Sequence, residues 1–361
     1  MDKATLILKQ LKANPFLTQQ QLADQIGLSR SAVANYIADL IRQGKIKGRA
    51  YVLGDENRIV CLGGANVDRK AVALEAVRYG SSNPVTTTDA LGGVARNVAE
   101  NLVQLGCSVS LFSRIGNDKE GQSLLEDAAQ KGIQMDLSEV VSDAKTGTYT
   151  ALIDLNGEMA VSLADMGIYD QLSLTKVEKM WPQLAMSHGL FMDTNFPAET
   201  LGFIVKKCHE DQVPLFVDPV SSLKAKKLPA DLTGVHILFP NLEEAEELSG
   251  ISIQNDADLE KATHIIQARG AQIVVVTLGS DGLYYAGASE RGKLSPFQVD
   301  IVDVTGAGDA LTAGVIAGLF HGETLSVACR WGMAAAALAL TSPKSVATDL
   351  SVAHIQAALQ P

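Results

Sequence analysis

The stretch Asp303-Val304-Thr305-Gly306-Ala307-Gly308-Asp309-Ala310 carries the most specific pattern in this sequence of 361 residues. Gly306, Ala307 and Gly308 have minimal side chains, and a run of small residues follows that we expect to be helical. Backbone N–H groups can therefore converge on an anion at the start of this helix, where the helix dipole favours negative charge. Asp309 would repel that anion unless it accepts the proton of an attacking hydroxyl. The stretch predicts a turn that catalyses phosphoryl transfer, although a plain turn in which Asp309 caps the helix has the same outline.

Around this stretch, apolar runs that predict buried strands alternate with segments of helical periodicity. The runs are IVCL (59–62), LFSRIG (111–116), GLFMD (189–193), PLFVDP (214–219), VHILFPN (235–241) and QIVVVTLG (272–279). Strands that alternate with helices predict an α/β fold with a doubly wound, mostly parallel sheet. Two stretches, about 68–91 and 146–166, are rich in Val, Thr and Tyr instead, and the second contains the hairpin turn Asn156-Gly157. We expect them to form a small separate sheet.

The first fifty residues contain three segments with the apolar spacing of helices. The first is expected at Ala4–Leu11, and the second at Gln19–Gln25, where Thr18 and Gln21 form a capping box. The third follows Ser29 and extends to about residue 43, and its inward side is expected to consist of Val33, Ile37, Ala38 and Ile41. The glycine turn between the second and third helices is typical of a helix-turn-helix. The segment KIKGRAYVL (45–53) is expected to form a basic wing.

Charge changes sign between this segment and the rest of the chain. Residues 1–50 hold eight Lys/Arg and three Asp, a net charge of +5, whereas the remaining 22 basic and 38 acidic residues give −16. We therefore expect a winged helix-turn-helix domain at 1–53 and a second domain at 57–361. The first resembles the DNA-binding domains of bacterial transcription regulators. In a DNA complex the major groove would receive Ser29, Arg30, Ser31 and Asn35, and the phosphates would contact Lys45, Lys47 and Arg49. A module that contacts protein is the alternative.

Composition narrows the class of protein further. The chain is 47% hydrophobic and 20% charged, as is usual for a globular protein. No apolar run reaches the roughly 18 residues of a membrane span, and Lys9 and Lys12 interrupt the apolar stretch at the start, so we expect no secretion signal. The four cysteines are scattered, which favours reduced thiols. We expect a cytoplasmic protein without a membrane partner, and no Walker A pattern occurs that would indicate P-loop chemistry.

The stretch 303–310 matches the catalytic signature of the PfkB, or ribokinase-like, carbohydrate kinase family. Four further segments match motifs of that family in the family's order, over residues 57–361: GANVD (64–68), GGVARN (92–97), NLEE (241–244) and TLGSDG (277–282). The resemblance implies an ATP-dependent kinase with a ribokinase-like sheet. It also implies that the stretches 68–91 and 146–166 form a β lid, which closes over the substrate and joins two chains into a homodimer.

The resemblance assigns a role to each matched position. Asp309 would be the general base, and the anion hole would consist of Gly306, Ala307 and Gly308. The sugar would be held by Asn66, Asp68 and Asn97, with close backbone approach at Gly92 and Gly93. The nucleotide would lie against Thr277, Gly279, Gly282, Thr305, Gly306 and Gly308, with Asn241 also on that side. Mg²⁺ would be held through water by Asn241 and Glu244. The candidates for a K⁺ site are the carbonyls of Asp303 and Thr305 and the segment Thr341–Ser345, where Pro343 departs from the family pattern.

Within the family, several strings are similar to those of bacterial pseudouridine kinases, among them GANVD, SSNP (81–84), GGVARN and PNLEEAE (240–246). This similarity implies that Asp309 deprotonates the 5′-hydroxyl of a nucleoside, with Ser82 and Thr150 near the base. Asp193 and Asn195 lie at a strand end, where α/β sheets place ligands, and a capping pair in a loop is the alternative for them. The helix-turn-helix and the run 69–79 depart from those kinases. A kinase for a free sugar and a transcription regulator that uses a kinase fold as a ligand sensor remain alternatives, although a sensor has no need of Asp309, Asn241 and Glu244.

Overall fold

The computed structural model describes residues 2–14, 17–46 and 58–360. The chain packs as two units: residues 1–58 with 175–188, and residues 59–174 with 189–361. Within the described ranges, no helix is long and apolar enough to cross a membrane.

The first unit contains the three predicted helices, α1 (Lys3–Ala13), α2 (Gln19–Ile26) and α3 (Arg30–Arg42). The capping box at Thr18 and Gln21 is present, and the Ser29 hydroxyl caps α3 by accepting the N–H of Ala32 at 3.1 Å. The prediction of which side chains of α3 face inward was wrong for the second half of the helix. Leu40 joins Val33 and Ile37 in the core, whereas Ala38 and Ile41 are exposed, because the i, i+4, i+7 spacing keeps one face of a helix inward. Most of the expected wing, residues 47–53, lies outside the described residues.

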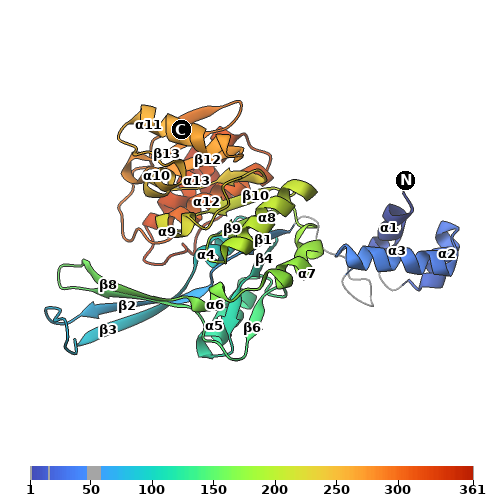
Figure 1. Cartoon of the computed structure of the whole chain (residues 1–361), viewed down its shortest axis with the longest axis horizontal. Coiled ribbons are helices and arrows are strands. Elements are labelled where there is room, and N and C mark those ends of the chain that lie inside the picture. The colour runs from blue at the N-terminus through green and yellow to red at the C-terminus, as the bar shows by residue number, and fades with distance from the viewer. Residues whose placement is uncertain (1, 15–16, 47–57, 361) are drawn as a thin grey trace. The chain divides into compact units, whose positions relative to one another are not determined.

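The second unit is built on an eight-stranded sheet with the strand order β14-β13-β12-β11-β10-β9-β1-β4 (Figure 1). Its strands are β1 (Ile59–Leu62), β4 (Val109–Phe112), β9 (Gly189–Asp193), β10 (Leu215–Asp218), β11 (Val235–Leu238), β12 (Ile273–Thr277), β13 (Leu283–Ala286) and β14 (Arg291–Leu294). The predicted strands pair in parallel, and the added β13 and β14 are antiparallel. The doubly wound, mostly parallel sheet is confirmed. Its central strands are apolar throughout because helices cover both faces.

The helix that follows the stretch 303–310 is α12 (Ala307–Phe320), and it packs with α4 (Val94–Gln104) and α13 (Leu325–Leu340) over one face of the sheet. Small residues let α12 and α13 approach closely, since a Cβ added to Gly314 would lie 2.7 Å from the Cα of Gly332. The other helices are α5 (Lys119–Gln130), α6 (Gly167–Asp170), α7 (Leu174–Leu184), α8 (Ala198–Asp211), α9 (Ser222–Ala225), α10 (Leu242–Ser249), α11 (Asp256–Ala268), α14 (Val352–Leu359) and the 3₁₀ turn Gly279–Asp281.

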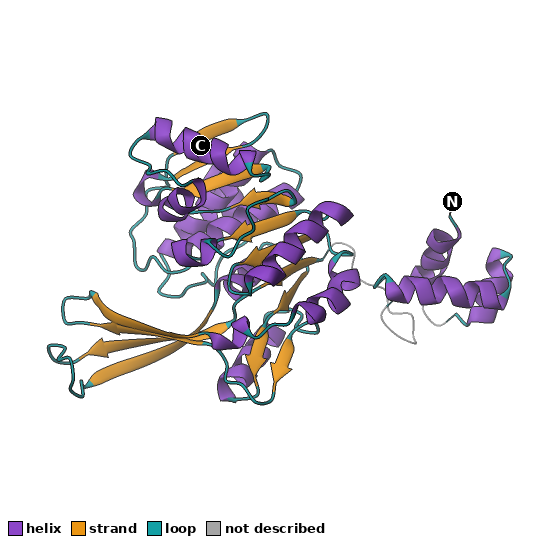
Figure 2. Cartoon of the chain, viewed as in Figure 1, coloured by secondary structure: helices purple, strands orange, loops and turns teal. Residues whose placement is uncertain are grey.

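The two Val/Thr/Tyr-rich stretches form the separate sheet that the sequence predicts, here called the accessory sheet. It has the order β3-β2-β7-β8, from β2 (Asn66–Ala73), β3 (Val85–Gly92), β7 (Thr148–Ile153) and β8 (Met159–Asp165). Figure 2 shows these strands extending away from the helices as a twisted ribbon. A further two-stranded pair is formed by β5 (Arg114–Gly116) and β6 (Glu139–Val141). The outer part of the accessory sheet exposes large apolar side chains, namely Val72, Leu74, Met159, Val161 and Leu163.

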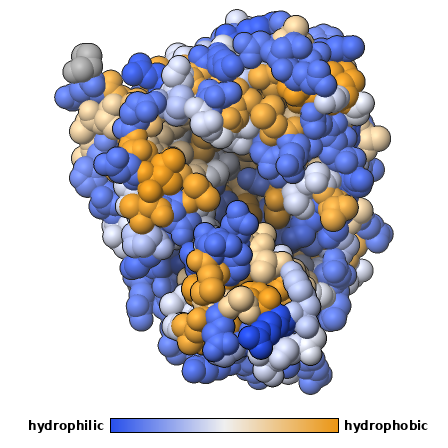
Figure 3. Space-filling view, turned by 90° about the vertical axis from the view of Figure 1, so that its left-hand side faces the viewer, coloured by the Kyte–Doolittle hydropathy of each residue, from blue (hydrophilic) through white to orange (hydrophobic). Residues whose placement is uncertain are grey.

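Strand order also locates the crevice of the fold. The chain proceeds from β1 to β4 at one edge, whereas β9 is followed by β10, β11 and β12 in the opposite direction. The connections therefore diverge at the carboxyl ends of β1 and β9, and open α/β sheets bind ligands at such a switch point. Figure 3, which looks at the end of the accessory sheet, shows the surface hollowed above that sheet.

Candidate active site

The glycine stretch forms the N-terminus of α12. Gly306 is its N-cap residue, with φ of +81°, and a Cβ at this position would lie 1.9 Å from the carbonyl oxygen of Ser345. Both the left-handed backbone and the lack of space require glycine here. The first N–H groups of a helix have no partner within it, so Ala307 and Gly308 begin a helix end that favours an anion. Asp309 lies in the first turn of this helix.

Asp309 is hydrogen-bonded to the second glycine motif. The side-chain nitrogen Nδ2 of Asn97 donates to Oδ2 of Asp309 at 2.8 Å, although the two residues are 212 positions apart in the chain. Burial raises the pKa of Asp309 to about 7, and the carboxylates of Asp193 and Asp68 add to this effect, whereas the Asn97 hydrogen bond and the charge of Arg96 oppose it. A carboxylate with a pKa near neutrality is suited to accept a proton at physiological pH.

The predicted sugar-binding residues meet where β1, β2, β3 and α4 join. Nδ2 of Asn66 donates to Oδ1 of Asp68 at 2.6 Å. A Cβ on Gly92 would lie 2.0 Å from Oδ2 of Asp68, and a Cβ on Gly93 would lie 2.4 Å from the carbonyl oxygen of Gly64. Gly92 therefore leaves the space that Asp68 occupies, and Gly93 lets the start of α4 approach the end of β1. Burial raises the pKa of Asp68.

Asp193 lies at the carboxyl end of β9 and binds backbone groups at the bottom of this crevice. It is fully buried, and its carboxylate accepts the N–H groups of Gly64 at 2.8 Å and Ala95 at 3.2 Å. It thereby joins the end of β1 to the start of α4. Its oxygen Oδ1 also accepts the N–H of Asn195 at 2.9 Å.

Lys224 is a candidate residue that the sequence reasoning missed. Its ammonium group donates to Oδ1 of Asn195 at 2.6 Å, and burial lowers its pKa. Lys224 is on the short helix α9, directly after the end of β10. The signal available in the sequence was a lysine soon after a strand end on the ligand-binding edge of the sheet.

A cavity of about 440 Å³ lies between the turn after β12 and the helices α12 and α13. Its lining includes the predicted nucleotide residues Thr277, Gly279, Gly282 and Gly308. Apolar side chains such as Leu311 and Met333 form much of the rest, and a cavity of this size and character suits the flat base of a nucleotide. The structure thus places a base-sized cavity at the N-terminus of α12.

Asn241 and Glu244 form a reciprocal cap at the start of α10. The Asn241 side chain accepts the N–H of Glu244 at 2.9 Å, and Glu244 accepts the N–H and Nδ2 of Asn241 at 2.9 and 3.0 Å. Burial raises the pKa of Asp218 at the end of β10, and the charges of Glu244 and Asp309 raise it further. A cation near these three acids would relieve their repulsion.

The donor set fits a hydrated cation rather than a directly chelated one. Among the described residues, no three His, Cys, Asp or Glu side chains form a group that could hold a metal ion. Mg²⁺ commonly keeps several of its waters and binds through few carboxylates. The acids at Asp218 and Glu244 fit that type of site.

The K⁺ candidates lie against the glycine stretch. Oδ1 of Asp303 accepts the N–H of Thr305 at 2.9 Å and its hydroxyl at 2.7 Å, which holds the turn before α12. The segment Thr341–Ser345 reaches this turn, since its Ser345 carbonyl is the group closest to Gly306.

Two expected base contacts lie away from Asp68 on the accessory sheet. Thr150 is in register with Arg69, so it lies on the opposite face of the accessory sheet from Asp68, which pairs with Tyr149. Ser82 is exposed in the loop beyond the pair formed by Ala73 and Val85, and this pair is five residues from Asp68, or roughly 17 Å along the strand. The alternation of side chains along a strand and the length of the hairpin explain both positions.

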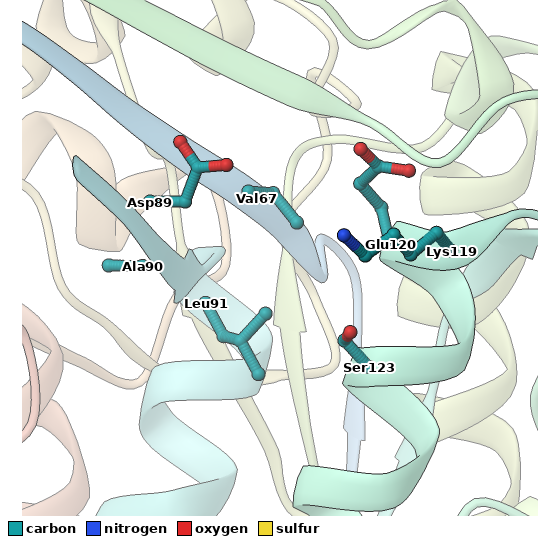
Figure 4. A pocket seen from close by; sticks show the side chains of 7 residues that line it. All are labelled: Val67, Asp89, Ala90, Leu91, Lys119, Glu120 and Ser123. Carbon is teal, nitrogen blue, oxygen red and sulfur yellow. The ribbon is translucent and has the colours of Figure 1, made fainter. Parts of the chain in front are cut away.

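A smaller cavity of about 150 Å³ lies at the root of the accessory sheet, against α5 (Figure 4). Leu91 and the Asp89 carboxylate approach it from β3, and Lys119 and Glu120 from α5. Asp89 is already paired with Arg69, at 2.9 Å. None of the predicted site residues lines this cavity, so the predicted chemistry lies elsewhere.

Comparison with known proteins agrees with this geometry. The model of the pfkB family carbohydrate kinases matches residues 56–351, and that of winged helix-turn-helix DNA-binding domains matches residues 1–47. A pseudouridine kinase of Escherichia coli is 33% identical over 302 residues, which are 83% of this chain and 96% of that protein. An uncharacterized sugar kinase of the same organism is 32% identical over 337 residues, 93% of this chain and 92% of that protein.

Solved structures show the same fold. A carbohydrate kinase from Agrobacterium tumefaciens has a TM-score of 0.74 at 32% identity, and the match covers 83% of this chain and 96% of that chain. With the glycine stretch at the start of α12 and the acidic crevice beside it, these matches show that the chain belongs to the pfkB family of carbohydrate kinases, phosphotransferases that act on an alcohol group, and that it carries a winged helix-turn-helix at its N-terminal end.

Proposed function

We propose that this protein transfers a phosphoryl group from ATP to the 5′-hydroxyl of a nucleoside, with pseudouridine as the first candidate. The observation that carries the proposal is the position of Asp309. It lies beside the helix end at Gly306–Gly308, with a pKa of about 7, and is hydrogen-bonded to the sugar-side residue Asn97. The similarity to an Escherichia coli pseudouridine kinase supports the nucleoside.

In this proposal the sugar lies over Asn66, Asp68 and the two glycines of β3. The Asp68 carboxylate accepts hydrogen bonds from two neighbouring ribose hydroxyls, and this fixes the orientation of the ribose. The 5′-hydroxyl then points at Asp309, which removes its proton as the oxygen attacks the terminal phosphorus. The N–H groups at the start of α12 hold the negative oxygens of the transferred group.

The nucleotide and its metal lie on the other side of Asp309. The 440 Å³ cavity holds the adenine, and the phosphates extend toward Gly308. Asn241 and Glu244 hold the waters of a Mg²⁺ ion, which supplies positive charge to the phosphates when it is bound. Asp303, Thr305 and the segment 341–345 are retained as candidates for a K⁺ site.

The accessory sheet is proposed to act as a lid, because it extends beside the crevice from the end of β1 and the start of α4. Closure would exclude water from the transferred phosphoryl group and limit hydrolysis of ATP. Its exposed apolar side chains, such as Leu163 at 63% exposure, favour contact with a second copy of the chain. Leu163→Glu should therefore convert a homodimer to monomers in size-exclusion chromatography with light scattering.

The test of the proposed function is a substrate screen. ATP consumption would be measured with pseudouridine, uridine, guanosine, ribose and fructose 6-phosphate, for the wild type and for Asp309→Asn. We expect turnover with a nucleoside that Asp309→Asn abolishes. Equal turnover in the two proteins would remove the base role, and turnover with ribose alone would replace the nucleoside by a free sugar.

We also propose that the N-terminal module binds DNA. The start of α3 is exposed at the residues expected to face a groove, Ser29, Arg30, Ser31 and Asn35, and this part of the chain is basic. Fluorescence anisotropy with genomic DNA fragments should show affinity that falls as salt rises. Binding that is absent or independent of salt would favour a module that contacts protein. DNA binding that depends on a ligand, without turnover, would favour a transcription regulator that uses the kinase fold as a ligand sensor.

A further inference from the structure

A buried arginine next to the sugar-side asparagine has so far entered only through the effect of its charge on the pKa of Asp309. Arg96 is the third residue of α4 and is 5% exposed. Its guanidinium donates to four acceptors. They are the carbonyl oxygen of Leu91 at 3.0 Å, Oδ1 of Asn97 at 2.9 Å, Oδ2 of Asp127 at 2.9 Å, and the carboxylate of Glu100.

The acidic partners of Arg96 hold it in place. Glu100 is on α4 and Asp127 is on α5, and Lys131 pairs with both, at 2.7 and 2.9 Å. Two acids and two bases therefore balance in a network between the two helices. The planar guanidinium is suited to this position, because its donors are fixed in a fork and reach several acceptors at once.

Arg96 decides which way the Asn97 side chain faces. An arginine has no acceptor, so the atom of Asn97 that meets it must be the oxygen Oδ1. The nitrogen Nδ2 then faces Asp309 and donates to it, as the structure records at 2.8 Å. In the opposite orientation two oxygens would face each other, unless Asp309 carried a proton to donate. A protonated Asp309 is the wrong form for a general base.

We propose that Arg96 is a positioning residue for phosphoryl transfer, which acts by fixing the Asn97 amide with its nitrogen toward Asp309. The inference rests on the proposed role of Asp309. With Oδ2 of Asp309 occupied by the Asn97 donor, the other carboxylate oxygen is left to receive the proton of the substrate hydroxyl. Arg96 also donates to the carbonyl oxygen of Leu91 near the end of β3, so the same residue ties the end of the accessory sheet to α4.

Three charged groups act on Asp309 from the elements packed around it: Arg96 of α4, Asp68 of β2 and Asp193 of β9. Asp218 of β10 also lies near, and the charge of Asp309 raises the pKa of Asp218. Asp68 and Asp193 favour the protonated form of Asp309, and Arg96 opposes it. The variant Arg96→Lys keeps the positive charge but removes the fork, so it isolates the orientation of Asn97 from the charge. The matched control is Arg114→Lys. Arg114 is 7% exposed, and it donates to Glu139 at 3.0 Å and to the Ile168 carbonyl at 2.7 Å.

The experiment is the pH dependence of kcat/KM, with ATP and the acceptor that gives the highest turnover in the substrate screen. The acid limb of the wild type should have its midpoint near the pKa of Asp309, about 7. In Arg96→Lys we expect the midpoint to rise by roughly one pH unit, which lowers kcat/KM about fivefold at pH 7. Near pH 9.5 the two proteins should approach each other. Arg114→Lys should leave the midpoint unchanged even where it lowers thermal stability.

A double variant tests whether the effect passes through Asn97. In the Asn97→Leu background, Arg96→Lys should produce no further change in the midpoint, and Asn97→Leu alone should raise it as Arg96→Lys does. If Arg96→Lys does not accumulate as folded protein, Asn97→Leu carries the test, and a wild-type midpoint in that variant overturns the proposal. A wild-type profile in folded Arg96→Lys also overturns it, as does an equal effect of Arg96→Lys in both backgrounds. Turnover that persists unchanged in Asp309→Asn would instead remove the base role of Asp309 on which this inference rests.

Discussion

The substitution Asp309→Asn should have opposite effects on activity and on stability. Asparagine keeps the shape of the side chain but cannot accept the proton of the attacking hydroxyl. A positioned general base contributes about 10²- to 10⁴-fold to a rate, which corresponds to about 3–5 kcal/mol in the activation free energy. We therefore expect kcat with a nucleoside acceptor to fall by that factor, while the KM for ATP changes little.

The effect on stability follows from the pKa of Asp309, which is about 7 in the folded chain against an ordinary value of 3.8. Folding favours the protonated form, so the folded state binds more protons than the unfolded state between these two values. The free energy of unfolding of the wild type then falls as the pH rises toward 7. Between pH 5.5 and 8.5 the free energy of unfolding falls only while the pH is below the pKa of about 7. At 1.36 kcal/mol per pH unit, this fall amounts to about 2 kcal/mol.

Asparagine at position 309 does not titrate, so this loss is absent from the variant. The free energy of unfolding would be measured by urea denaturation at pH 5.5, 7 and 8.5 for both proteins. The stability of the variant relative to the wild type should rise by about 2 kcal/mol over this range. The other acids of the crevice titrate in both proteins and largely cancel in the difference.

A constant difference in stability across this range would refute the reasoning, because it would mean that the pKa of Asp309 is not raised. If the relative stability rises but turnover is not lost, the raised pKa of Asp309 is supported and its role as the general base is not.

Three further substitutions test other parts of the site. Gly92→Ala places a Cβ 2.0 Å from Oδ2 of Asp68, so the KM for the acceptor should rise about tenfold or more in steady-state kinetics, with the KM for ATP unchanged. Glu244→Gln removes a charge that we propose holds metal-bound water, so the Mg²⁺ concentration needed for half-maximal rate should rise about tenfold. Arg30→Ala at the exposed start of α3 should lower DNA affinity and reduce the salt slope by about one, whereas Arg42→Ala, which breaks the pair with Asp39, should change the slope less.

Each of these has a clear contrary result. An unchanged acceptor KM in Gly92→Ala would mean that the Asp68 carboxylate moves freely or does not hold the sugar. An unchanged Mg²⁺ requirement in Glu244→Gln would leave that residue as a helix cap alone. Equal salt slopes for Arg30→Ala and Arg42→Ala would remove α3 from the DNA interface.

Local patterns in the sequence predicted most of the elements of this fold. The strand at Ile59–Leu62 agrees with the structure at both ends, because a run of apolar residues and the turn residues that follow it lie within a few positions of each other. The capping box at Thr18 likewise depends only on residues three apart. The inward face of α3 was the exception, since Ile41 is apolar but lies outside the buried stripe.

The candidate site depended on contacts that no local pattern contains. The hydrogen bond between Asn97 and Asp309 joins residues 212 positions apart, and only the packing of α4 against α12 brings them together. The face on which Thr150 lies was set by the register between β2 and β7, which a strand does not encode by itself. Lys224 became a candidate only when the strand order placed the end of β10 beside that of β9.

The sequence by itself therefore determined the class of fold, the glycine stretch of residues 303–310 and the kind of chemistry that an acid beside an anion site can perform. The tertiary structure decided which residues act on that acid and which do not. The physical reason is how far apart in the chain the interacting residues lie. Helix periods, caps and tight glycine turns are short-range properties of the chain, whereas the ionisation of Asp309 depends on burial and on charges from three separate elements.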